Sequence, residues 1–361
     1  MKKILLLSGY DAASHRYWRT LLQQQMPDYE WTQIAMPDRH FAWRVRGNSM
    51  GFAFTHREQL TQHYDLLIVT SMVDLSSLIG FCPNLGNIPT IVYFHENQFA
   101  YPVAKEHKNL VNIQLTSIYT ALCTDTLLFN SRYNKNTFME GCEKLLARLP
   151  DQVPAGLIEK LNSVAEILPV PIAADVAQFM HMIPRANPVP EIVWNHRWEY
   201  DKQPDVFFNA LKLLRASGTD FKLHILGQSF RNSPDCFNEI EQEFAQQLMH
   251  FGYLPRNEYL QVLARSDIVV SSALHDFQGL SIQEGMSLGC SPVAPNRVAY
   301  PEYIPHQHLY DESSDTIDEE QSLFNTLIQV LDYDPSDSLA LDEYQIEVLI
   351  PRYRQVIDKL L

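Results

Sequence analysis

The sequence predicts an α/β protein built from two doubly wound parallel β-sheets that face each other across a cleft. Three observations lead to this fold class. Short apolar runs rich in β-branched and aromatic residues alternate with longer stretches of helical periodicity, which is typical of βαβ units. The short runs are apolar almost throughout, as expected for strands covered by helices on both faces. A proline-rich stretch near the middle of the 361 residues divides this pattern into halves of similar size.

Each half contains predicted strands with predicted helices between them. The strands of the first half are Lys3–Ser8, Asp65–Thr70, Thr90–His95 and Thr126–Asn130, and those of the second half are Glu191–Asn195, Lys222–Gly227, Asp267–Ser271 and Ser291–Ala294. The helices are His15–Gln25, Val111–Cys123, Asp205–Ala216, Phe237–Met249, Asn257–Ala264 and Leu280–Leu288. Ligands of such sheets bind at the carboxyl ends of the strands, so functional residues are expected in the loops that follow them.

Length and proline content predict the domain boundaries. A prior of roughly 150 residues per domain gives two domains for this chain. The stretch around Pro169 and Pro171 is expected to be an extended hinge, because proline fixes φ and disfavours helix in the preceding residue. We therefore expect an N-terminal domain at 1–170, a linker at 171–185 and a second domain at 186–335. A C-terminal helix is expected at 336–361, where it can pack back on the first domain.

Composition excludes several classes of protein. The net charge of −15 argues against a general nucleic-acid coat protein, although it leaves room for a local basic patch. No apolar run approaches the ~20 residues of a membrane helix, and the apolar stretch after Met1 is too short for a signal peptide. The five cysteines are scattered and form no CxxC, which favours a reducing cytoplasm over a disulfide framework or a structural zinc site.

Two cations follow the predicted strand Glu191–Asn195. Arg197 and Lys202 lie five residues apart, so at the carboxyl end of a parallel strand they can converge on a diphosphate. Arginine offers a planar fork of donors, and lysine a compact point charge. Cations near a strand end are more often simply solvated, so this pattern by itself favours the structural alternative slightly.

A loop and helix after the predicted strand Asp267–Ser271 form the second candidate. Asp276 lies in the loop, Gly279 precedes the helix, and Leu280 and Ser281 open it. The first turn of a helix carries free N–H groups and the positive end of the dipole, which suits a phosphate. Glu284 lies inside the helix, where a carboxylate can accept hydrogen bonds from ribose hydroxyls. The alternative is a pair of surface acids beside a buried helix.

His95 ends a predicted buried strand in the first half and is followed by Glu96, Asn97 and Gln98. Such polar groups are costly to bury without partners. A single histidine is more often a satisfied core group than a catalyst, but the strand-end position and the polar run favour function here.

The segment from Arg39 to Arg57 holds basic residues and no acid, interleaved with aromatic residues. These are Arg39, His40, Arg44, Arg46, His56 and Arg57, together with Phe41, Trp43, Phe52 and Phe54. Arginines beside aromatic rings suit phosphate contacts and base stacking on an RNA loop. The alternative is an amphipathic helix with Phe52 and Phe54 in the core and the arginines in solvent, and the residues alone favour that alternative.

Missing motifs narrow the chemistry further. No G-x-G-x-x-G follows the first strand, which removes the main support for a dinucleotide oxidoreductase. Walker A, HExxH and G-x-S-x-G patterns are absent from the sequence as well. The thirteen histidines form no obvious ligand set, so no metal site is expected.

Taken together, the second half resembles the donor-binding domain of a retaining GT-B glycosyltransferase. In that family an arginine and a lysine five residues apart hold the donor diphosphate, and an E-x7-E motif ends the site. Arg197 and Lys202 match the pair, and Asp276 with Glu284 matches the motif with aspartate in the first place. The stretch Phe251–Pro255, with Tyr253 and Leu254, resembles the loop that contacts the donor base.

Several distinctive stretches carry a narrower resemblance, which spans roughly residues 3 to 305. They are Ser14-His15, Met36–Arg44, Tyr93–Gln98, Ile192–Glu199 and Pro295–Glu302. They resemble the tRNA-queuosine α-mannosyltransferase family.

This resemblance implies transfer of mannose from GDP-mannose to the cyclopentenediol of queuosine in a tRNA anticodon loop, with retained configuration. It implies no metal and no cofactor, a nucleotide sugar and queuosine-containing tRNA as partners, a cytoplasmic enzyme, and no stable membrane association. His95 and Asp276 are the expected catalytic residues, facing the sugar from opposite domains. Expected donor-binding residues are Arg197, Lys202, Tyr253, Leu254, Gly279, Leu280, Ser281 and Glu284. Expected acceptor-binding residues are Ser14, His15, Arg39, Trp43, Arg44, Arg46, Glu96, Asn97 and Gln98.

Three alternatives remain open at this stage. The first is a GT-B glycosyltransferase that uses another nucleotide sugar and a lipid, polysaccharide or small-molecule acceptor. The second is a non-catalytic nucleotide or tRNA binder on the same scaffold. The third is a sugar-nucleotide epimerase, which also uses two such domains but would convert the donor with no acceptor present.

Overall fold

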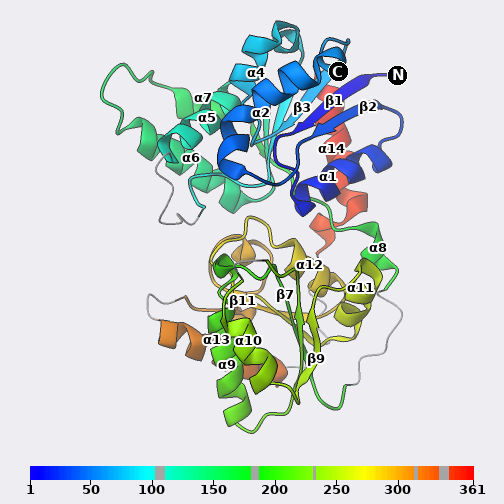
Figure 1. The fold of residues 1–361 in the computed structure, drawn as a ribbon, viewed down its shortest axis with the longest axis vertical. Helices are drawn as coiled ribbons and strands as arrows, with labels where there is room; N and C mark the ends of the chain where they lie inside the picture. The colour runs from blue at the N-terminus through cyan, green and yellow to red at the C-terminus, as the bar shows by residue number, and fades with distance from the viewer. Residues whose placement is uncertain (102–109, 180–186, 231–232, 313–315, 333–340) are drawn as a thin grey trace. The chain divides into compact units, whose positions relative to one another are not determined.

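The computed structural model describes residues 1–101, 110–179, 187–230, 233–312, 316–332 and 341–361 (Figure 1). Two compact units form: Met1–Pro171 together with Glu347–Leu361, and Ile172–Ile346. Each unit contains one six-stranded β-sheet, and all strand pairs in both sheets are parallel. The predicted α/β class with two parallel sheets is therefore confirmed.

The sheet of the first unit has the strand order β2-β1-β3-β4-β5-β6. The strands are β1 (Lys3–Ser8), β2 (Glu30–Ala35), β3 (Leu66–Thr70), β4 (Thr90–Phe94), β5 (Thr126–Phe129) and β6 (Ala165–Ile167). All residues of β3, β4 and β5 are buried, which explains their continuous apolar sequences. Because all pairs are parallel, the loops that follow these strands open at one edge of the sheet.

Helices cover both faces of this sheet (Figure 1). They are α1 (Ala13–Gln25), α2 (Phe41–Thr55), α3 (Arg57–Leu60), α4 (Leu75–Phe81), α5 (Leu110–Leu122), α6 (Arg132–Leu146), α7 (Leu157–Ser163) and α14 (Ile346–Leu360), with a 3₁₀ turn at Pro83–Asn87. Side-chain caps start two of them: Asp74 accepts the Ser77 N–H at α4, and Ser131 accepts the Asn134 N–H at α6.

The C-terminal helix α14, red in Figure 1, packs in the first unit beside α1. Its Tyr353 is buried, and the hydroxyl accepts the Trp18 indole N–H at 3.0 Å. The same oxygen lies 3.0 Å from both the Tyr93 hydroxyl and the Pro169 carbonyl. One phenol thus joins α1, β4, the segment after β6 and α14.

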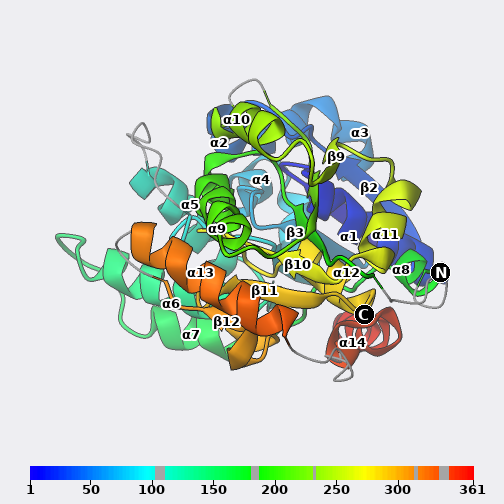
Figure 2. The same ribbon diagram turned by 90° about the horizontal axis from the view of Figure 1, so that it is seen from below.

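The sheet of the second unit has the strand order β12-β11-β10-β7-β8-β9. The strands are β7 (Glu191–Asn195), β8 (Lys222–Leu226), β9 (Leu248–Gly252), β10 (Ile268–Val270), β11 (Ser291–Pro295) and β12 (Leu309–Tyr310). The helices are α8 (Ala174–Ala177), α9 (Pro204–Ala216), α10 (Cys236–Glu243), α11 (Arg256–Arg265), α12 (Leu280–Ser287) and α13 (Thr316–Leu331). Short 3₁₀ turns lie at Tyr200–Lys202, Tyr300–Glu302, His306–His308 and Asp342–Tyr344. Figure 2 shows α9 and α13 side by side.

The prediction of one helix over Phe237–Met249 is wrong in its second part. Helix α10 ends at Glu243, and Leu248 begins the edge strand β9, which pairs with β8. Phe237, Ile240 and Phe244 are buried at helical spacing, and Leu248 continues that spacing by coincidence. The pairing with β8 therefore overrides a local pattern that by itself favours helix.

The boundary between the two compact units lies within the predicted linker 171–185. The unit boundary lies between Pro171 and Ile172, and the Ile172 N–H donates to the Tyr344 carbonyl in the second unit. Residues 172–179 of the predicted linker therefore form part of the second unit, with α8 among them. Residues 180–185 of that linker, and 333–340 at the end of the second domain and the start of the C-terminal segment, lie outside the described residues.

Replacing Tyr353 with phenylalanine tests the role of the C-terminal helix in the first unit. The variant leaves the buried Trp18 indole N–H without an acceptor, so the free energy of unfolding should fall by about 1–3 kcal/mol. Urea unfolding followed by tryptophan fluorescence measures this change. Gln355→Ala, at an exposed position of α14, is the control and should be neutral. Equal stability of the two variants would show that the phenol contributes nothing.

Candidate functional site

In the second unit, the candidate residues gather where β7 and β10 end and α12 begins. Asn195 is the last residue of β7, and its side-chain amide donates to the Ser281 carbonyl at 2.9 Å. His196 follows it, with Nδ1 3.4 Å from the Ser281 hydroxyl. The predicted strand Glu191–Asn195 and the predicted first turn of α12 are thus held together at the carboxyl edge of the sheet, as expected for ligand binding in an α/β fold.

Lys202 is buried below this edge, with its side chain 10% exposed. Its ammonium group donates to the His275 carbonyl at 2.6 Å and lies 3.5 Å from the Asp201 carboxylate and 3.8 Å from that of Asp276. Arg197 is different, because its side chain is 52% exposed and pairs with Glu199 at 2.7 Å. The pKa values of His196 and His275 respond to the charges of both cations, so both lie near the same imidazoles.

Asp276 holds the loop that precedes α12. Its Oδ1 accepts the Gly279 N–H at 2.8 Å, and its Oδ2 accepts the Tyr300 hydroxyl at 3.2 Å. Burial raises the pKa of Asp276, but Lys202 and the two neighbouring histidines outweigh burial, so the pKa lies below its ordinary value. The carboxylate is therefore ionised at neutral pH and is oriented by the main chain.

Gly279 is required at its position for two reasons. Its φ of +81° lies in the left-handed region that favours glycine. A Cβ atom there would also overlap the Tyr303 hydroxyl and lie 2.8 Å from the Tyr300 ring. The sharp turn leaves the N–H groups of the first turn of α12, including those of Leu280 and Ser281, without partners inside the helix.

Glu284 lies on α12 in a network that the sequence analysis did not find. One carboxylate oxygen pairs with the Arg256 guanidinium at 2.6 Å, and the other accepts the Tyr259 hydroxyl at 2.9 Å. The Asn195 amide donates to the same Tyr259 oxygen at 3.0 Å, and Arg256 also forms two hydrogen bonds to Asp175. Burial raises the pKa of Glu284, and Arg256 opposes that rise.

Tyr253 and Leu254 lie in the loop between β9 and α11. The Tyr253 side chain is 73% exposed, whereas Leu254 packs against the core of the second unit. Arg256 and Tyr259 begin α11 directly after this loop. In the sequence, only the resemblance of this loop to a loop that contacts the donor base pointed to this region. That resemblance gave no indication that Arg256 and Tyr259 contact Glu284.

In the first unit, His95 directly follows β4 and is buried. Its ring stacks on that of His15 from α1, with 4.0 Å between the centroids, and meets the edge of Trp18. Neither ring nitrogen of His95 has a hydrogen-bond partner among the described residues. Burial, followed by the neighbouring His15, places the pKa of His95 well below its ordinary value, and burial lowers the pKa of His15 to about 4. Both imidazoles are therefore neutral at pH 7.

The polar run after His95 serves mainly to hold the loop. The Asn97 amide donates to the side chains of Asn134 and Thr137, and its oxygen accepts the N–H groups of Phe99 and Ala100. Glu96 and Gln98 accept hydrogen bonds through their main-chain carbonyls, from the Ser71 hydroxyl and the Gln114 amide respectively. Ser14 lies half-buried in the first turn of α1, next to His15.

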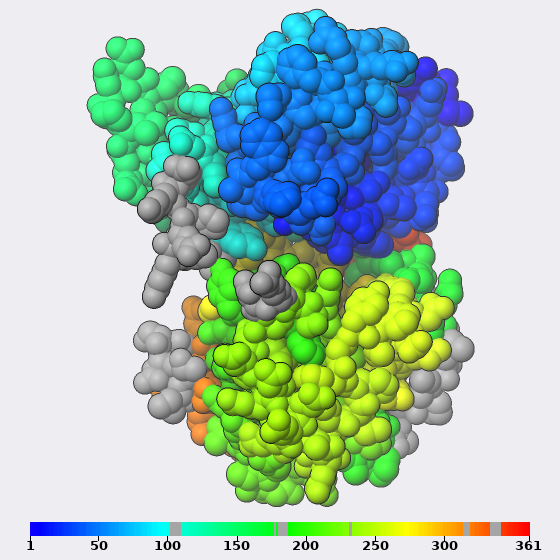
Figure 3. All heavy atoms as spheres, in the orientation of Figure 1, coloured from blue at the N-terminus to red at the C-terminus, as the bar shows by residue number. Residues whose placement is uncertain are grey.

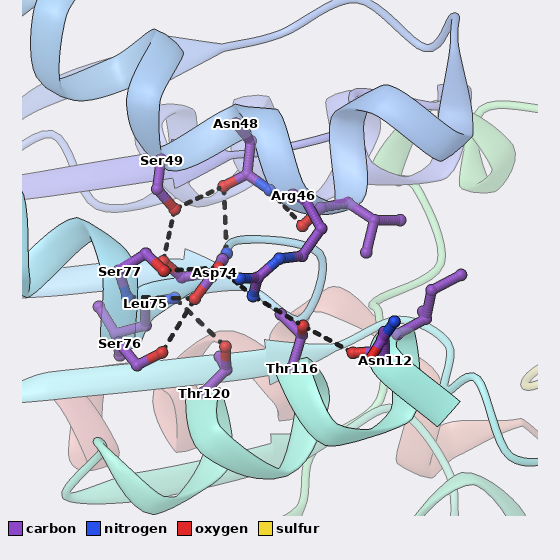
Figure 4. Close-up of polar contacts among 12 residues, drawn as sticks. Arg46, Asn48, Ser49, Asp74, Leu75, Ser76, Ser77, Asn112, Thr116 and Thr120 are labelled. Carbon is purple, nitrogen blue, oxygen red and sulfur yellow. Dashed lines mark hydrogen bonds and ion pairs between the residues drawn. The ribbon is translucent and has the colours of Figure 1, made fainter. Parts of the chain in front are cut away.

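The basic segment of the first unit forms α2 and the residues just before it. Arg39 and Trp43 are exposed, and Arg44 is half-buried. Arg46 pairs with the buried Asp74 carboxylate at 2.8 Å and donates to the Thr116 hydroxyl at 3.2 Å (Figure 4). Of the two phenylalanines expected in the core, Phe52 is buried. The expectation for Phe54 is wrong, because it is 63% exposed and its ring meets that of the exposed Phe81.

In the described ranges, no group of three or more His, Cys, Asp or Glu side chains is placed to hold a metal ion. None of the helices in the described part of the chain is both long and apolar enough to cross a bilayer.

The buried histidines predict how stability depends on pH. Burial lowers the pKa of His196 to about 3 and those of His275 and His15 to about 4, and it lowers the pKa of His95 well below its ordinary value. Below pH of about 6.5 the unfolded chain binds protons at these positions and the folded chain does not. The free energy of unfolding should therefore fall as the pH is lowered from 7 to 5, with a slope for each such histidine that is small near pH 7 and approaches about 1.4 kcal/mol per pH unit well below pH 6.5.

Urea unfolding at several pH values between 7 and 5 measures this slope. His196→Asn removes one of the buried imidazoles, so its slope should be smaller than that of the unmodified protein. Gln307→Asn, at an exposed position without an ionisable group, is the control and should leave the slope unchanged. The same slope in all three proteins would contradict the assignment of a neutral, buried His196.

Comparison with known proteins adds to this geometry. Residues 3–172 match the family described as tRNA-queuosine alpha-mannosyltransferase N-terminal, and residues 183–322 match Glycosyl transferases group 1. A Drosophila melanogaster protein named tRNA-queuosine alpha-mannosyltransferase is 28% identical over 367 residues, which cover 99% of this chain and 96% of that protein.

Two solved structures agree in fold. Sucrose-phosphate synthase from Thermosynechococcus elongatus has a TM-score of 0.71 at 15% identity, covering 100% of this chain and 99% of the other. HepE from Anabaena, in complex with UDP, has a TM-score of 0.68 at 12% identity, covering 99% and 100%. At such identities these likenesses show the GT-B fold and nothing of the substrates. The chain is thus a glycosyltransferase with GT-B architecture, in which the first unit is similar to the N-terminal domain of tRNA-queuosine alpha-mannosyltransferases and the second unit is similar to group 1 glycosyl transferases.

Proposed function

We propose that this enzyme transfers mannose from GDP-mannose to the cyclopentenediol of queuosine in a tRNA anticodon loop, with retention of configuration. The observation that carries the proposal is the match of residues 3–172 to the tRNA-queuosine alpha-mannosyltransferase N-terminal family. The curated Drosophila relative supports it, because its similarity extends over 99% of the chain. The nucleotide sugar acts as a substrate, and no metal or cofactor is included in the proposal.

The second unit is proposed to bind the donor. In the reaction the bond from mannose C1 to GDP breaks, a bond to the acceptor hydroxyl forms, and negative charge develops on the departing diphosphate. Lys202, Arg197 and the free N–H groups at the start of α12 are cationic or hydrogen-bond donors, so they stabilise that charge. Glu284 lies on the same helix, held by Arg256 and Tyr259, and is proposed to accept hydrogen bonds from ribose hydroxyls. Tyr253 and Leu254 are proposed to contact the base.

Asp276 and His95 are the proposed catalytic residues, one from each unit. Asp276 is ionised, since Lys202 lowers its pKa against the effect of burial, and an ionised carboxylate can accept hydrogen bonds from sugar hydroxyls. His95 is neutral and has two ring nitrogens without partners among the described residues, so it can both donate to and accept from a sugar. His15 stacks on it and fixes the plane of its ring.

The first unit is proposed to bind the acceptor tRNA. Ser14, His15 and the loop Glu96–Gln98 lie near the end of β4, and Arg39, Trp43, Arg44 and Arg46 lie in or beside α2. With a net charge of −15, the protein should bind tRNA weakly, because few phosphate contacts are available, and binding should weaken further as salt is raised. A tRNA acceptor also implies that the enzyme acts in the cytoplasm without stable membrane association.

Transfer of labelled mannose from GDP-mannose to queuosine-containing tRNA tests the proposal as a whole. Label is expected only on queuosine-containing tRNA, and queuosine-free tRNA of the same sequence is the control. No transfer to either tRNA, together with binding or turnover of another nucleotide sugar, would keep the glycosyltransferase and reject the acceptor. Conversion of GDP-mannose without any acceptor would point instead to an epimerase.

Substituting Lys202 with methionine tests the donor site. Because the ammonium stabilises the leaving diphosphate, kcat should fall by about 100-fold or more, and tRNA binding should stay unchanged. The variant leaves Asp201 and Asp276 without their buried cation, so its melting temperature is measured in parallel. Arg197→Gln changes a half-exposed side chain and therefore leaves no buried carboxylate without its cation. This variant should cause a smaller loss of kcat. Full activity in both variants would exclude these cations from the donor site.

A further inference from the structure

An exposed indole on α2 has a fixed position although most of it is open to solvent. Trp43 is 55% exposed. Its ring lies over Gly47, one turn further along the helix, where a Cβ atom would come within 2.5 Å of the indole Cε2 and 2.6 Å of Cζ2. Glycine inside a helix costs about 1 kcal/mol relative to alanine, so this position sacrifices stability. What the glycine provides is space for the ring against the helix surface, with the ring's other side exposed.

The arginines of the first unit differ in whether they pair with a carboxylate. Arg16, Arg19 and Arg354 all pair with carboxylates. Arg39 and Arg44, in contrast, have no carboxylate partner among the described residues, and Arg44 Nε is buried without a hydrogen bond. Arg39 and Arg44 lie four residues before and one residue after the exposed Trp43. In a chain of net charge −15, guanidinium groups without carboxylates so close in sequence to an exposed aromatic ring suit an anionic ligand with a flat apolar part.

Helix α2 is also held firmly in place below the indole. Arg46 binds the Asp74 carboxylate and the Thr116 hydroxyl, and the Asn48 side chain accepts the Asp74 N–H (Figure 4). The Asn48 amide also donates to the Met72 carbonyl. These contacts link α2 to the start of α4 and to α5. The arrangement is therefore built before any ligand binds, which lowers the entropy lost on binding. Figure 3 shows α2, in mid-blue, at the surface of the first unit.

We propose that Trp43, lying on Gly47, is a stacking platform for one unpaired base of an RNA, and that Arg39 and Arg44 contact the phosphates beside that base. Stacking on an aromatic ring next to arginines is how proteins bind single-stranded RNA, whereas a duplex hides its base faces. The proposal rests on the proposed function in one respect, because it takes RNA to be the acceptor class. It adds which side chain holds an unpaired nucleotide and why residue 47 is glycine.

The apolar face of α2 supplies a matched control. Residues 43, 47, 50 and 54 lie on one face of the helix, and Phe54 is exposed like Trp43. Phe54 packs edge-on against Phe81, with 5.6 Å between the ring centroids, and does not lie on a glycine. Removal of Phe54 should therefore leave RNA binding unchanged. An apolar surface that binds a membrane or a protein would instead need both rings.

The test measures the affinity of the full chain for a labelled RNA stem-loop and for a duplex of the same length, by fluorescence anisotropy at one fixed salt concentration. Stacking of one base is worth about 1–3 kcal/mol, so Trp43→Ala should weaken stem-loop binding about 5- to 150-fold. Trp43→Phe should restore most of it. Phe54→Ala should bind as the unmodified protein does, and binding of the duplex should be equally weak in all variants.

Gly47→Ala is the most informative variant. Alanine favours the helix, so the melting temperature should stay the same or rise, but the new methyl group displaces the indole and weakens stem-loop binding. A loss of RNA affinity in a protein that is no less stable cannot come from unfolding.

Several outcomes would overturn the platform. Unchanged stem-loop affinity in Trp43→Ala would do so, as would equal losses in Trp43→Ala and Phe54→Ala, or Trp43-dependent binding to anionic phospholipid vesicles. These results are separate from the test of the proposed function. If the unmodified enzyme mannosylates queuosine-containing tRNA while Trp43→Ala binds and modifies it normally, the platform alone fails. If no tRNA is mannosylated but stem-loop RNA still binds through Trp43, the platform stands and the proposed reaction fails.

Discussion

One buried ammonium group organises the candidate donor site of the second unit. Taking Lys202 out of water is unfavourable, and the cost is offset only because the carboxylates of Asp201 and Asp276 and the His275 carbonyl surround its Nζ atom. The main chain at the same position completes the arrangement. Ser272 donates to the Lys202 carbonyl, and the Leu274 N–H donates to the Asp201 carbonyl. The loop between β10 and α12 is therefore shaped around this lysine, and the start of α12 follows from the shape of the loop.

The cost of burying a charge also explains the neutral histidines of the two units. In their case the cost is not offset, so the charge is lost. Among the residues that the structure describes, no carboxylate is close enough to His95 to offset its burial, so it loses its charge, and both ring nitrogens remain available for other partners. Near Lys202, His196 is buried and also repelled by a cation, which lowers its pKa to about 3. A diphosphate bound beside Lys202 would oppose both effects and raise that pKa, because an anion favours the imidazolium form. Donor binding and the protonation of His196 are then coupled.

The sequence predicted the core of both sheets well, because central parallel strands are apolar along their whole length. It missed the edge strands β2 and β6, where burial is partial and the apolar pattern is broken. Motif spacing predicted Lys202, Asp276 and Glu284 as site residues; in the structure Lys202 lies 3.8 Å from Asp276, and Glu284 lies on α12. Arg256 and Tyr259 were missed because their contacts with Glu284 span more than twenty residues and leave no local pattern. Asn97 was predicted as a site residue because it is polar and follows a buried strand, but its side chain stabilises its own loop through hydrogen bonds to Asn134 and the Phe99 N–H.

The aspartate at position 276 is explained by the loop in which it lies. The family pattern to which this chain is similar has glutamate there, with a side chain longer by one methylene. An aspartate carboxylate reaches main-chain N–H groups two and three residues further on, as Asp276 does at Gln278 and Gly279. Its second oxygen meets Tyr300 and faces Lys202. The shorter side chain thus keeps the negative charge inside the turn that Gly279 makes, between the lysine and the start of α12. A glutamate would have to extend its carboxylate beyond these N–H groups, so the turn and the buried lysine favour aspartate at this position.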